Sequence, residues 1–103
     1  MYRMDHAYKR HRYWLKCDEL ERLPSEYFLQ NVYMTFQDDW TAFQLREHMN
    51  VERLMWANDF PHSDATWPHS QEMLAEHTAD MTDWEKARIL HENVSELYGL
   101  DVH

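Results

Sequence analysis

The run Leu54-Met55-Trp56-Ala57 is the feature that most constrains how this chain can fold. Its residues are apolar at consecutive positions, whereas a strand with one face in water alternates apolar and polar residues. A strand covered on both faces is typical of a parallel sheet, because helices pack on each side of such a sheet. The sequence therefore predicts a buried strand over residues 53–59, which ends on the carboxylate of Asp59.

A second strand is predicted over residues 31–36, where the sequence NVYMTF is rich in β-forming residues and alternates in polarity. Asp38 and Asp39 would start a helix that continues to Met49. Two parallel strands joined by a helix form a βαβ unit. Such a unit leaves strand edges and faces without neighbours, so we expect it to be part of a larger sheet.

Helices are predicted on both sides of this unit. The apolar spacing indicates one over residues 5–21 and a weaker one over 70–80, and residues 24–31 are expected to form a connector with one helical turn. The clearest helix covers 82–98, where Thr82 and Glu85 form a capping box.

The chain holds one glycine, Gly99, placed to end this last helix. Asn31, Asn50 and Asn58 fall at predicted boundaries, so we expect asparagine to supply the left-handed positions elsewhere.

Composition and charge restrict the partners and the compartment. Aromatic residues make up 15% of the chain, which indicates a packed protein, and a net charge of −9 disfavours binding to nucleic acid. No apolar run is long enough to span a membrane, and no secretory signal is visible. A single cysteine, Cys17, excludes an internal disulfide and is interpreted as a small core residue, so a cytoplasmic location is expected.

From the residues alone, Asp59 allows two interpretations. It would lie at the carboxyl end of a parallel strand, where α/β folds keep their active sites, but from the residues alone a turn ahead of Pro61 is the more common role of such an aspartate. His62 could be an exposed loop histidine. The eight histidines lack the close spacings of a zinc site, so a self-contained metal centre is not expected.

Three segments together resemble the C-terminal quarter of the amidohydrolase-related family. They are LPSEYFLQNVYMTFQDD, then ERLMWANDFPHSDATWPHS, and a closing helix that ends ILHENVSELYGL. The family comprises metal-dependent hydrolases and decarboxylases on a TIM barrel, and aminocarboxymuconate-semialdehyde decarboxylase is one member. The Asp-Phe-Pro-His element with Trp67-Pro68 after it is the most specific part of the match.

The resemblance implies a fold and a set of roles. The two strands would be the seventh and eighth of the barrel, so residues 1–103 are expected to be an α/β, C-terminal fragment of a TIM (β/α)8 barrel with about two parallel strands and four to five helices. Asp59 would bind the active-site divalent metal, most often zinc, and would carry a proton. His62 would contact substrate, and Trp67 would form a wall of the pocket.

Two departures from the family pattern bear on these roles. Ala57-Asn58 stands where the family commonly has Gly-Ser, and Asn50 stands where it has glycine. The family's other metal ligands, a His-x-His pair and a histidine on a middle strand, have no counterpart here. The missing N-terminal barrel portion and a small-molecule substrate are therefore the expected partners, with a homo-oligomer expected for the complete enzyme.

Hydrolysis and non-oxidative decarboxylation of a small carboxylic acid both remain open, because both would use the same metal and aspartate. The 103-residue chain by itself is expected to be inactive. The alternative from another class is a non-catalytic helical interaction protein derived from the barrel.

Overall fold

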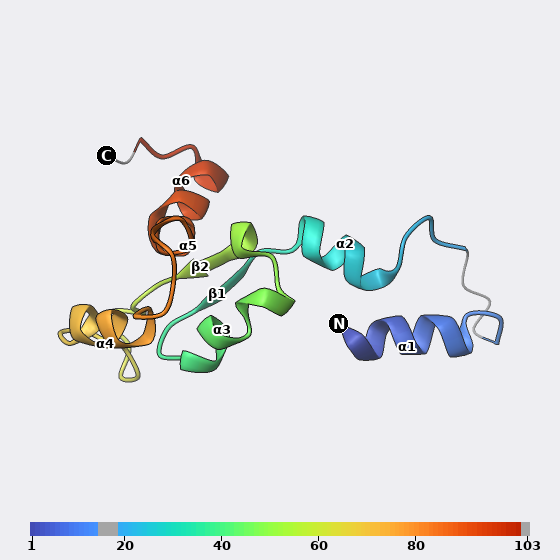
Figure 1. The fold of residues 1–103 in the computed structure, drawn as a ribbon, viewed down its shortest axis with the longest axis horizontal. Coiled ribbons are helices and arrows are strands. Elements are labelled where there is room, and N and C mark those ends of the chain that lie inside the picture. The colour runs from blue at the N-terminus through green and yellow to red at the C-terminus, as the bar shows by residue number, and fades with distance from the viewer. Residues whose placement is uncertain (15–18, 102–103) are drawn as a thin grey trace. The chain divides into compact units, whose positions relative to one another are not determined.

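The computed structural model describes residues 1–14 and 19–101. The chain divides into two compact units, Met1–Val32 and Tyr33–His103. Figure 1 shows that the first unit is helical and that the second contains both strands. No helix in the described ranges is long and apolar enough to cross a membrane.

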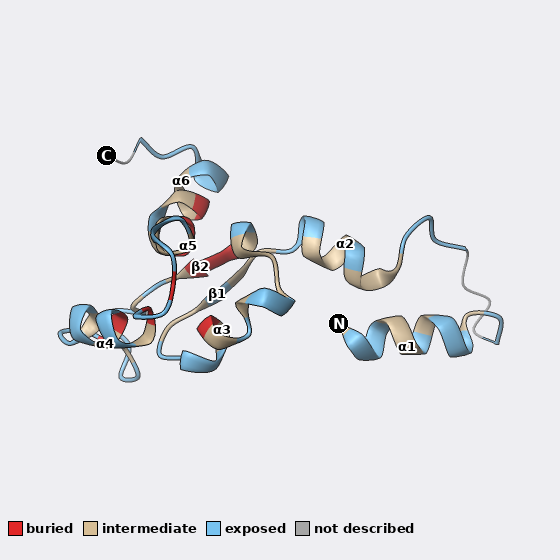
Figure 2. Ribbon diagram, viewed as in Figure 1, coloured by how far each residue is buried: buried red, intermediate tan, exposed pale blue. Residues whose placement is uncertain are grey.

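Unit Met1–Val32 consists of helices α1 (Tyr2–His11) and α2 (Pro24–Asn31). The carboxylate of Asp5 on α1 accepts hydrogen bonds from the backbone N–H of Ser25 at 2.8 Å and from its hydroxyl at 2.6 Å. These two bonds lower the pKa of Asp5 and join the helices. Neither helix contains a buried residue, as the absence of red from both in Figure 2 shows.

Helix α1 is shorter than predicted, because it starts at Tyr2 and ends at His11 instead of spanning residues 5–21. The guanidinium of Arg12 lies over the ring of Tyr13 and hydrogen-bonds its hydroxyl, while the Tyr8 hydroxyl accepts from the backbone N–H of Leu20. The described residues 12–14 form a turn in place of the predicted helix. The predicted core residue Cys17 lies outside the described residues.

Helix α2 corrects the expectation of a connector with one helical turn. Pro24 occupies the first helical position, where its missing N–H costs nothing, and the Glu26 carboxylate accepts a hydrogen bond from the backbone N–H of Leu23. The first turn therefore leaves neither of these two positions with an unpaired N–H, and the helix continues to Asn31.

Unit Tyr33–His103 is built on two parallel strands, β1 (Met34–Phe36) and β2 (Leu54–Trp56). Met34 pairs with Leu54, and Phe36 pairs with Trp56. Helix α3 (Trp40–Gln44) and the 3₁₀ turns η1 (Arg46–His48) and η2 (Val51–Arg53) connect them. The predicted parallel βαβ arrangement is confirmed, and the sheet formed by the described residues has two strands.

Both strands are shorter than the predicted ranges 31–36 and 53–59. Asn31 is the last residue of α2, so β1 can begin only after the chain has left that helix. Beyond β2, one more ladder bond runs from the N–H of Ala57 to the carbonyl of Phe36 at 3.0 Å. The chain then leaves the sheet because Asp59 has a left-handed backbone, with φ of 61°.

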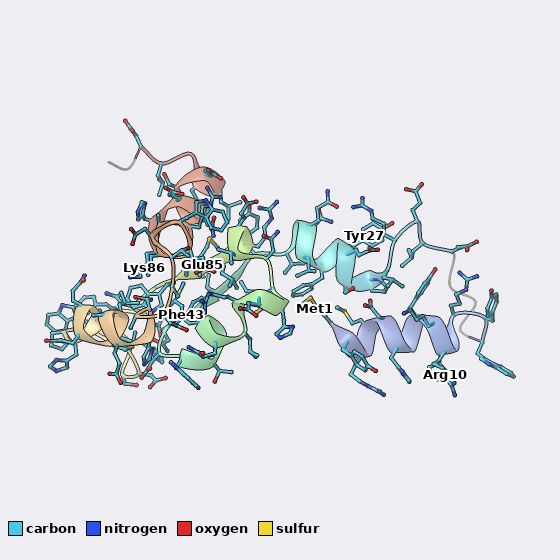
Figure 3. All side chains as sticks on the ribbon, viewed as in Figure 1. Met1, Arg10, Tyr27, Phe43, Glu85 and Lys86 are labelled. Atoms are coloured by element: carbon cyan, nitrogen blue, oxygen red, sulfur yellow. The ribbon has the colours of Figure 1, made fainter. Side chains whose placement is uncertain are left out.

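The core of this unit lies between β2, α3 and the helical segments that follow β2 in the chain. These are α4 (Ser70–His77), α5 (Asp83–Ala87), the π-helical turn η3 (Arg88–Glu92) and α6 (Asn93–Tyr98). The buried cluster comprises Phe43, Leu54, Leu74, Met81 and Ile89. Figure 2 shows buried segments on β2, α3, α4 and the last helix, and Figure 3 shows Phe43 among the side chains of this unit.

The last helix confirms the predicted start and end. The Thr82 hydroxyl accepts from the N–H of Glu85, and the Glu85 carboxylate accepts from the N–H of Thr82 at 3.0 Å. Gly99 ends the helix with φ of 64°. The π-helical turn in the middle was not predicted. It is followed by Asn93, whose side chain faces β2.

Asn93 joins this helix to the amino end of β2. It is 1% exposed, and its Nδ2 donates to the carbonyls of Val51 at 2.6 Å and Leu54 at 2.8 Å. A second link runs from Arg46 Nε to Glu85 Oε1 at 3.1 Å, and Arg46 also donates to the carbonyl of Phe43. Together these bonds hold α3, β2 and the last helix in one unit.

The expected role of asparagine in left-handed positions is wrong for the described residues. Asp59 and Gly99 have positive φ there, whereas Asn31 is helical and Asn50 has φ of −94°. Asn50 instead lies at the start of the following 3₁₀ turn. Its side chain accepts from the N–H of Glu52 and so starts η2.

Candidate functional site

Asp59 lies three residues beyond Trp56, at the carboxyl end of β2. Its side chain is 53% exposed, and its carbonyl accepts a hydrogen bond from the N–H of His62 at 2.8 Å. The side chain of Asn58 accepts from the N–H of Phe60 at 3.0 Å and fixes the turn that carries Asp59. Asp59 therefore forms a turn, and its carboxylate is exposed at the carboxyl end of a parallel strand.

His62 lies beside this carboxylate. Its Nδ1 is 3.5 Å from Asp59 Oδ2, and its ring is 69% exposed. The segment that carries both residues, 59–66, is here called the Asp59 loop. Two hydrogen bonds close this loop. The N–H of Ala65 donates to the carbonyl of His62, and the N–H of Thr66 donates to the carbonyl of Asn58. The structure thus brings Asp59 and His62 together on one surface.

Trp67 follows the loop directly and is 60% exposed. Its ring packs edge-to-face on Phe60, with ring centroids 5.2 Å apart. The bonds before Pro61 and Pro68 are both cis. Phe60 was not predicted as a site residue, although its place directly after Asp59 is the signal that could have identified it. The pair forms an exposed apolar surface that includes the residue directly after Asp59.

Gln37 is a second residue at this edge that no sequence motif indicated. It follows β1 directly, so it lies at the same edge of the parallel sheet as the Asp59 loop. Its Nε2 donates to Asp64 Oδ2 at 3.3 Å, and its carbonyl accepts from the indole N–H of Trp56 at 2.8 Å. The signal in the sequence was a polar residue directly after a predicted strand.

The described residues do not form a complete metal centre. No group of three or more histidine, cysteine, aspartate or glutamate residues lies close enough, in residues 1–14 and 19–101, to hold a metal ion. The chemistry of the Asp59 carboxylate fits one position in the coordination shell of a divalent metal, with His62 beside it. A cavity of about 290 Å³ lies elsewhere, between β1, α3 and β2, and its lining includes Met34, Ala42 and Leu54.

A parallel βαβ unit with polar side chains at the carboxyl ends of its strands belongs to the class of α/β folds that carry enzyme active sites at this edge. The family model described as Amidohydrolase matches residues 3–100, so the chain belongs to the amidohydrolase family, whose members are TIM-barrel enzymes. The resemblance is thereby confirmed at the level of the family. No curated protein matches the chain.

Proposed function

We propose that this chain supplies the last two strands of an amidohydrolase barrel, with β1 and β2 as the seventh and eighth. The family, the parallel pairing and the two-stranded sheet of the described residues support this assignment. A TIM barrel closes with eight strands, so the other strands would pair with the edges of β1 and β2. The polypeptide that supplies them is then the main partner of this chain.

Asp59 is the proposed metal ligand and the proposed proton carrier. The observation that carries this proposal is its place, because the carboxylate stands exposed at the carboxyl end of β2 with His62 Nδ1 at 3.5 Å. A carboxylate that is not committed to a salt bridge with lysine or arginine can accept a proton and return it. His62 would contact the substrate, and Trp67 would wall the pocket.

A divalent metal, zinc in this proposal, would polarise the reacting group of the substrate and lower the pKa of water. Asp59 would hold it together with ligands from the other strands. The residues of this chain then orient the reactants: Asp59 accepts or donates the proton, and His62 can hydrogen-bond a carboxylate of the substrate. Phe60 and Trp67 would exclude water on one side, because their paired rings are apolar.

The proposed substrate is a small carboxylic acid, and the reaction is hydrolysis or non-oxidative decarboxylation. The two reactions share the carboxylate at Asp59, so the residues of this chain serve either one. A relation to the aminocarboxymuconate-semialdehyde decarboxylase group is part of this proposal. It rests on the Asp-Phe-Pro-His element and the Trp67-Pro68 pair.

The test uses the complete barrel. A reading frame with a His-x-His motif about two hundred residues upstream of β2 would identify the polypeptide that supplies the other strands. In that enzyme, Asp59→Asn is expected to lower kcat by at least about 10²-fold, because an amide has nearly the same shape but cannot accept the proton. Turnover is measured on a panel of small carboxylic acids and amides.

Glu72→Gln is the matched control. Glu72 pairs with a histidine three residues away, as Asp59 does, with His69 Nδ1 at 3.5 Å from Glu72 Oε2. This pair lies at the start of α4 and outside the proposed site. Wild-type turnover is expected in the control. Wild-type turnover in Asp59→Asn would overturn the assigned role.

A further inference from the structure

We propose that Gln37 is a positioning residue for the Asp59 loop and so for the carboxylate of the candidate site. This inference rests on the proposed function, because it gives that site a second anchor, from β1. Gln37 reaches the loop from the neighbouring strand, since β1 and β2 end at the same edge of the parallel sheet. Its main chain contacts Trp56 on β2, and its side chain contacts Asp64 in the Asp59 loop.

The main chain of Gln37 is fixed against β2. Its carbonyl accepts from the indole N–H of Trp56 at 2.8 Å, and the preceding carbonyl, of Phe36, accepts from the N–H of Ala57 at 3.0 Å. The position of Gln37 relative to the end of β2 is therefore set by two hydrogen bonds. The Cα atom from which the Gln37 side chain extends is therefore held in place relative to β2.

The side chain of Gln37 then holds the loop. Its Nε2 donates to Asp64 Oδ2 at 3.3 Å, and Asp64 lies in the loop between His62 and Thr66. A carboxylate can only accept, so the amide must present its nitrogen to Asp64 and turn its oxygen away. That oxygen, Gln37 Oε1, is buried and has no hydrogen-bond partner among the described residues.

A buried amide oxygen without a donor destabilises the fold, so packing alone would favour an apolar side chain at this position. The hydrogen bond to Asp64 explains why a carboxamide stands at this position instead. Because that bond crosses from β1 to the loop, it restrains the turn that places Asp59 and His62. Loss of the bond should loosen the loop and leave the rest of the unit unchanged.

The test is amide hydrogen exchange, measured by NMR on the full chain at neutral pH. Gln37→Glu keeps the shape of the side chain but puts a carboxylate opposite Asp64. We expect exchange of the loop amides to rise about tenfold, since one hydrogen bond is replaced by repulsion. The loop amides are those of His62, Ala65 and Thr66, which donate to loop and turn carbonyls.

A second substitution makes the test specific. In the double variant Gln37→Glu with Asp64→Asn, the asparagine amide can donate to the new carboxylate, so exchange of the loop amides is expected to return to within about twofold of wild type. Asp64→Asn alone should have little effect, because the asparagine oxygen still accepts from Gln37. The N–H of Lys86, bonded to the carbonyl of Thr82, reports on the rest of the unit.

Unchanged loop exchange in Gln37→Glu would overturn the proposal. An equal rise at Lys86 would also overturn it, because that result would show a loss of overall stability. Failure of the double variant to restore protection would contradict the proposed contact. None of these results depends on metal or turnover, so they leave the role of Asp59 to its own test.

Discussion

Asp59 carries a carboxylate in a backbone conformation that residues other than glycine rarely adopt. Its φ of 61° lies in the left-handed region, which glycine adopts without cost and which aspartate tolerates better than most residues. A chain selected only for its turn would favour glycine or asparagine at this position. The presence of aspartate is therefore explained by the function proposed for its carboxylate.

Stability measurements on the full chain can separate the two properties. Asp59→Gly is expected to leave the free energy of unfolding unchanged or to raise it by up to about 1 kcal/mol, because the strain is relieved. Asp59→Val is expected to lower it by about 1–2 kcal/mol, since a β-branched residue resists positive φ. Urea denaturation measures both. A large loss in Asp59→Gly would show that the carboxylate is needed for the fold.

The left-handed conformation of Asp59 was not predictable from the sequence, although its place near a strand was. The sequence predicted a strand that ends on Asp59, whereas β2 ends at Trp56 and Asp59 follows it by three residues, at the same edge of the sheet. It assigned the left-handed conformation to asparagines, because their general preference was the available guide. The structure gives it to Asp59, since the side chain of the preceding Asn58 is engaged with the N–H of Phe60.

Asn93 is the buried polar residue on which the last helix depends. Asn93→Ala should lower the free energy of unfolding by about 2–3 kcal/mol, because two carbonyls at the amino end of β2 lose their donor in a buried place. His91→Ala is the control, since His91 is exposed on the same helix and should change stability by less than about 0.5 kcal/mol. Equal effects in both variants would contradict the role of Asn93.

Among the elements, Glu85 supports both the start of the last helix and its link to Arg46 on η1. Figure 3 labels Glu85 and Lys86 on α5. The N–H of Thr82 and then the guanidinium of Arg46 lower the pKa of Glu85 below its usual value of 4.5, against the opposing effect of burial. A carboxyl whose pKa is lowered by folding stabilises the protein above its usual pKa, and this contribution is lost as the pH falls.

The pH dependence of stability tests this assignment. In Glu85→Gln the loss of stability between pH 7 and pH values below 4.5 is expected to be smaller than in wild type, because one carboxyl with a lowered pKa has been removed. Urea denaturation at a series of pH values measures it. Glu76→Gln, an exposed carboxyl on α4, should retain the wild-type profile. An unchanged profile in Glu85→Gln would contradict the role of its carboxylate.

The elements also show where sequence patterns are sufficient. Local signals predicted the start and end of the last helix, because the capping box and Gly99 act within a few residues. The extents of α1 and of both strands depend on contacts between distant residues. For α1, such contacts are the hydrogen bonds from the N–H of Leu20 to the Tyr8 hydroxyl and from the N–H of Ser25 to Asp5. A local sequence pattern does not show which distant residues come into contact, so the predicted ranges were too long.

At the scale of the whole molecule, the described sheet has two strands and two edges without a strand neighbour. Open edges present unpaired N–H and C=O groups and favour association. The 103-residue chain alone is therefore expected to associate as its concentration rises. Thr35, exposed in the middle of β1, is the position at which a charged residue should oppose this association.

Light scattering with size-exclusion chromatography measures the effect. Thr35→Lys is expected to shift the chain toward monomer, whereas Ser63→Lys, at an exposed loop position, should behave as wild type. A single monomeric species of wild type at all concentrations would contradict the open-edge account. It would favour the alternative of an independent, non-catalytic interaction protein.

The most direct measurement of the central claim is the distance between the Asp59 carboxylate and the metal in the complete barrel. Anomalous diffraction at the absorption edge of the bound metal gives this distance. The account predicts a carboxylate oxygen at about 2.0–2.2 Å from the ion, as expected for a zinc ligand. An ion held by the other strands, with Asp59 outside its coordination shell, would contradict it.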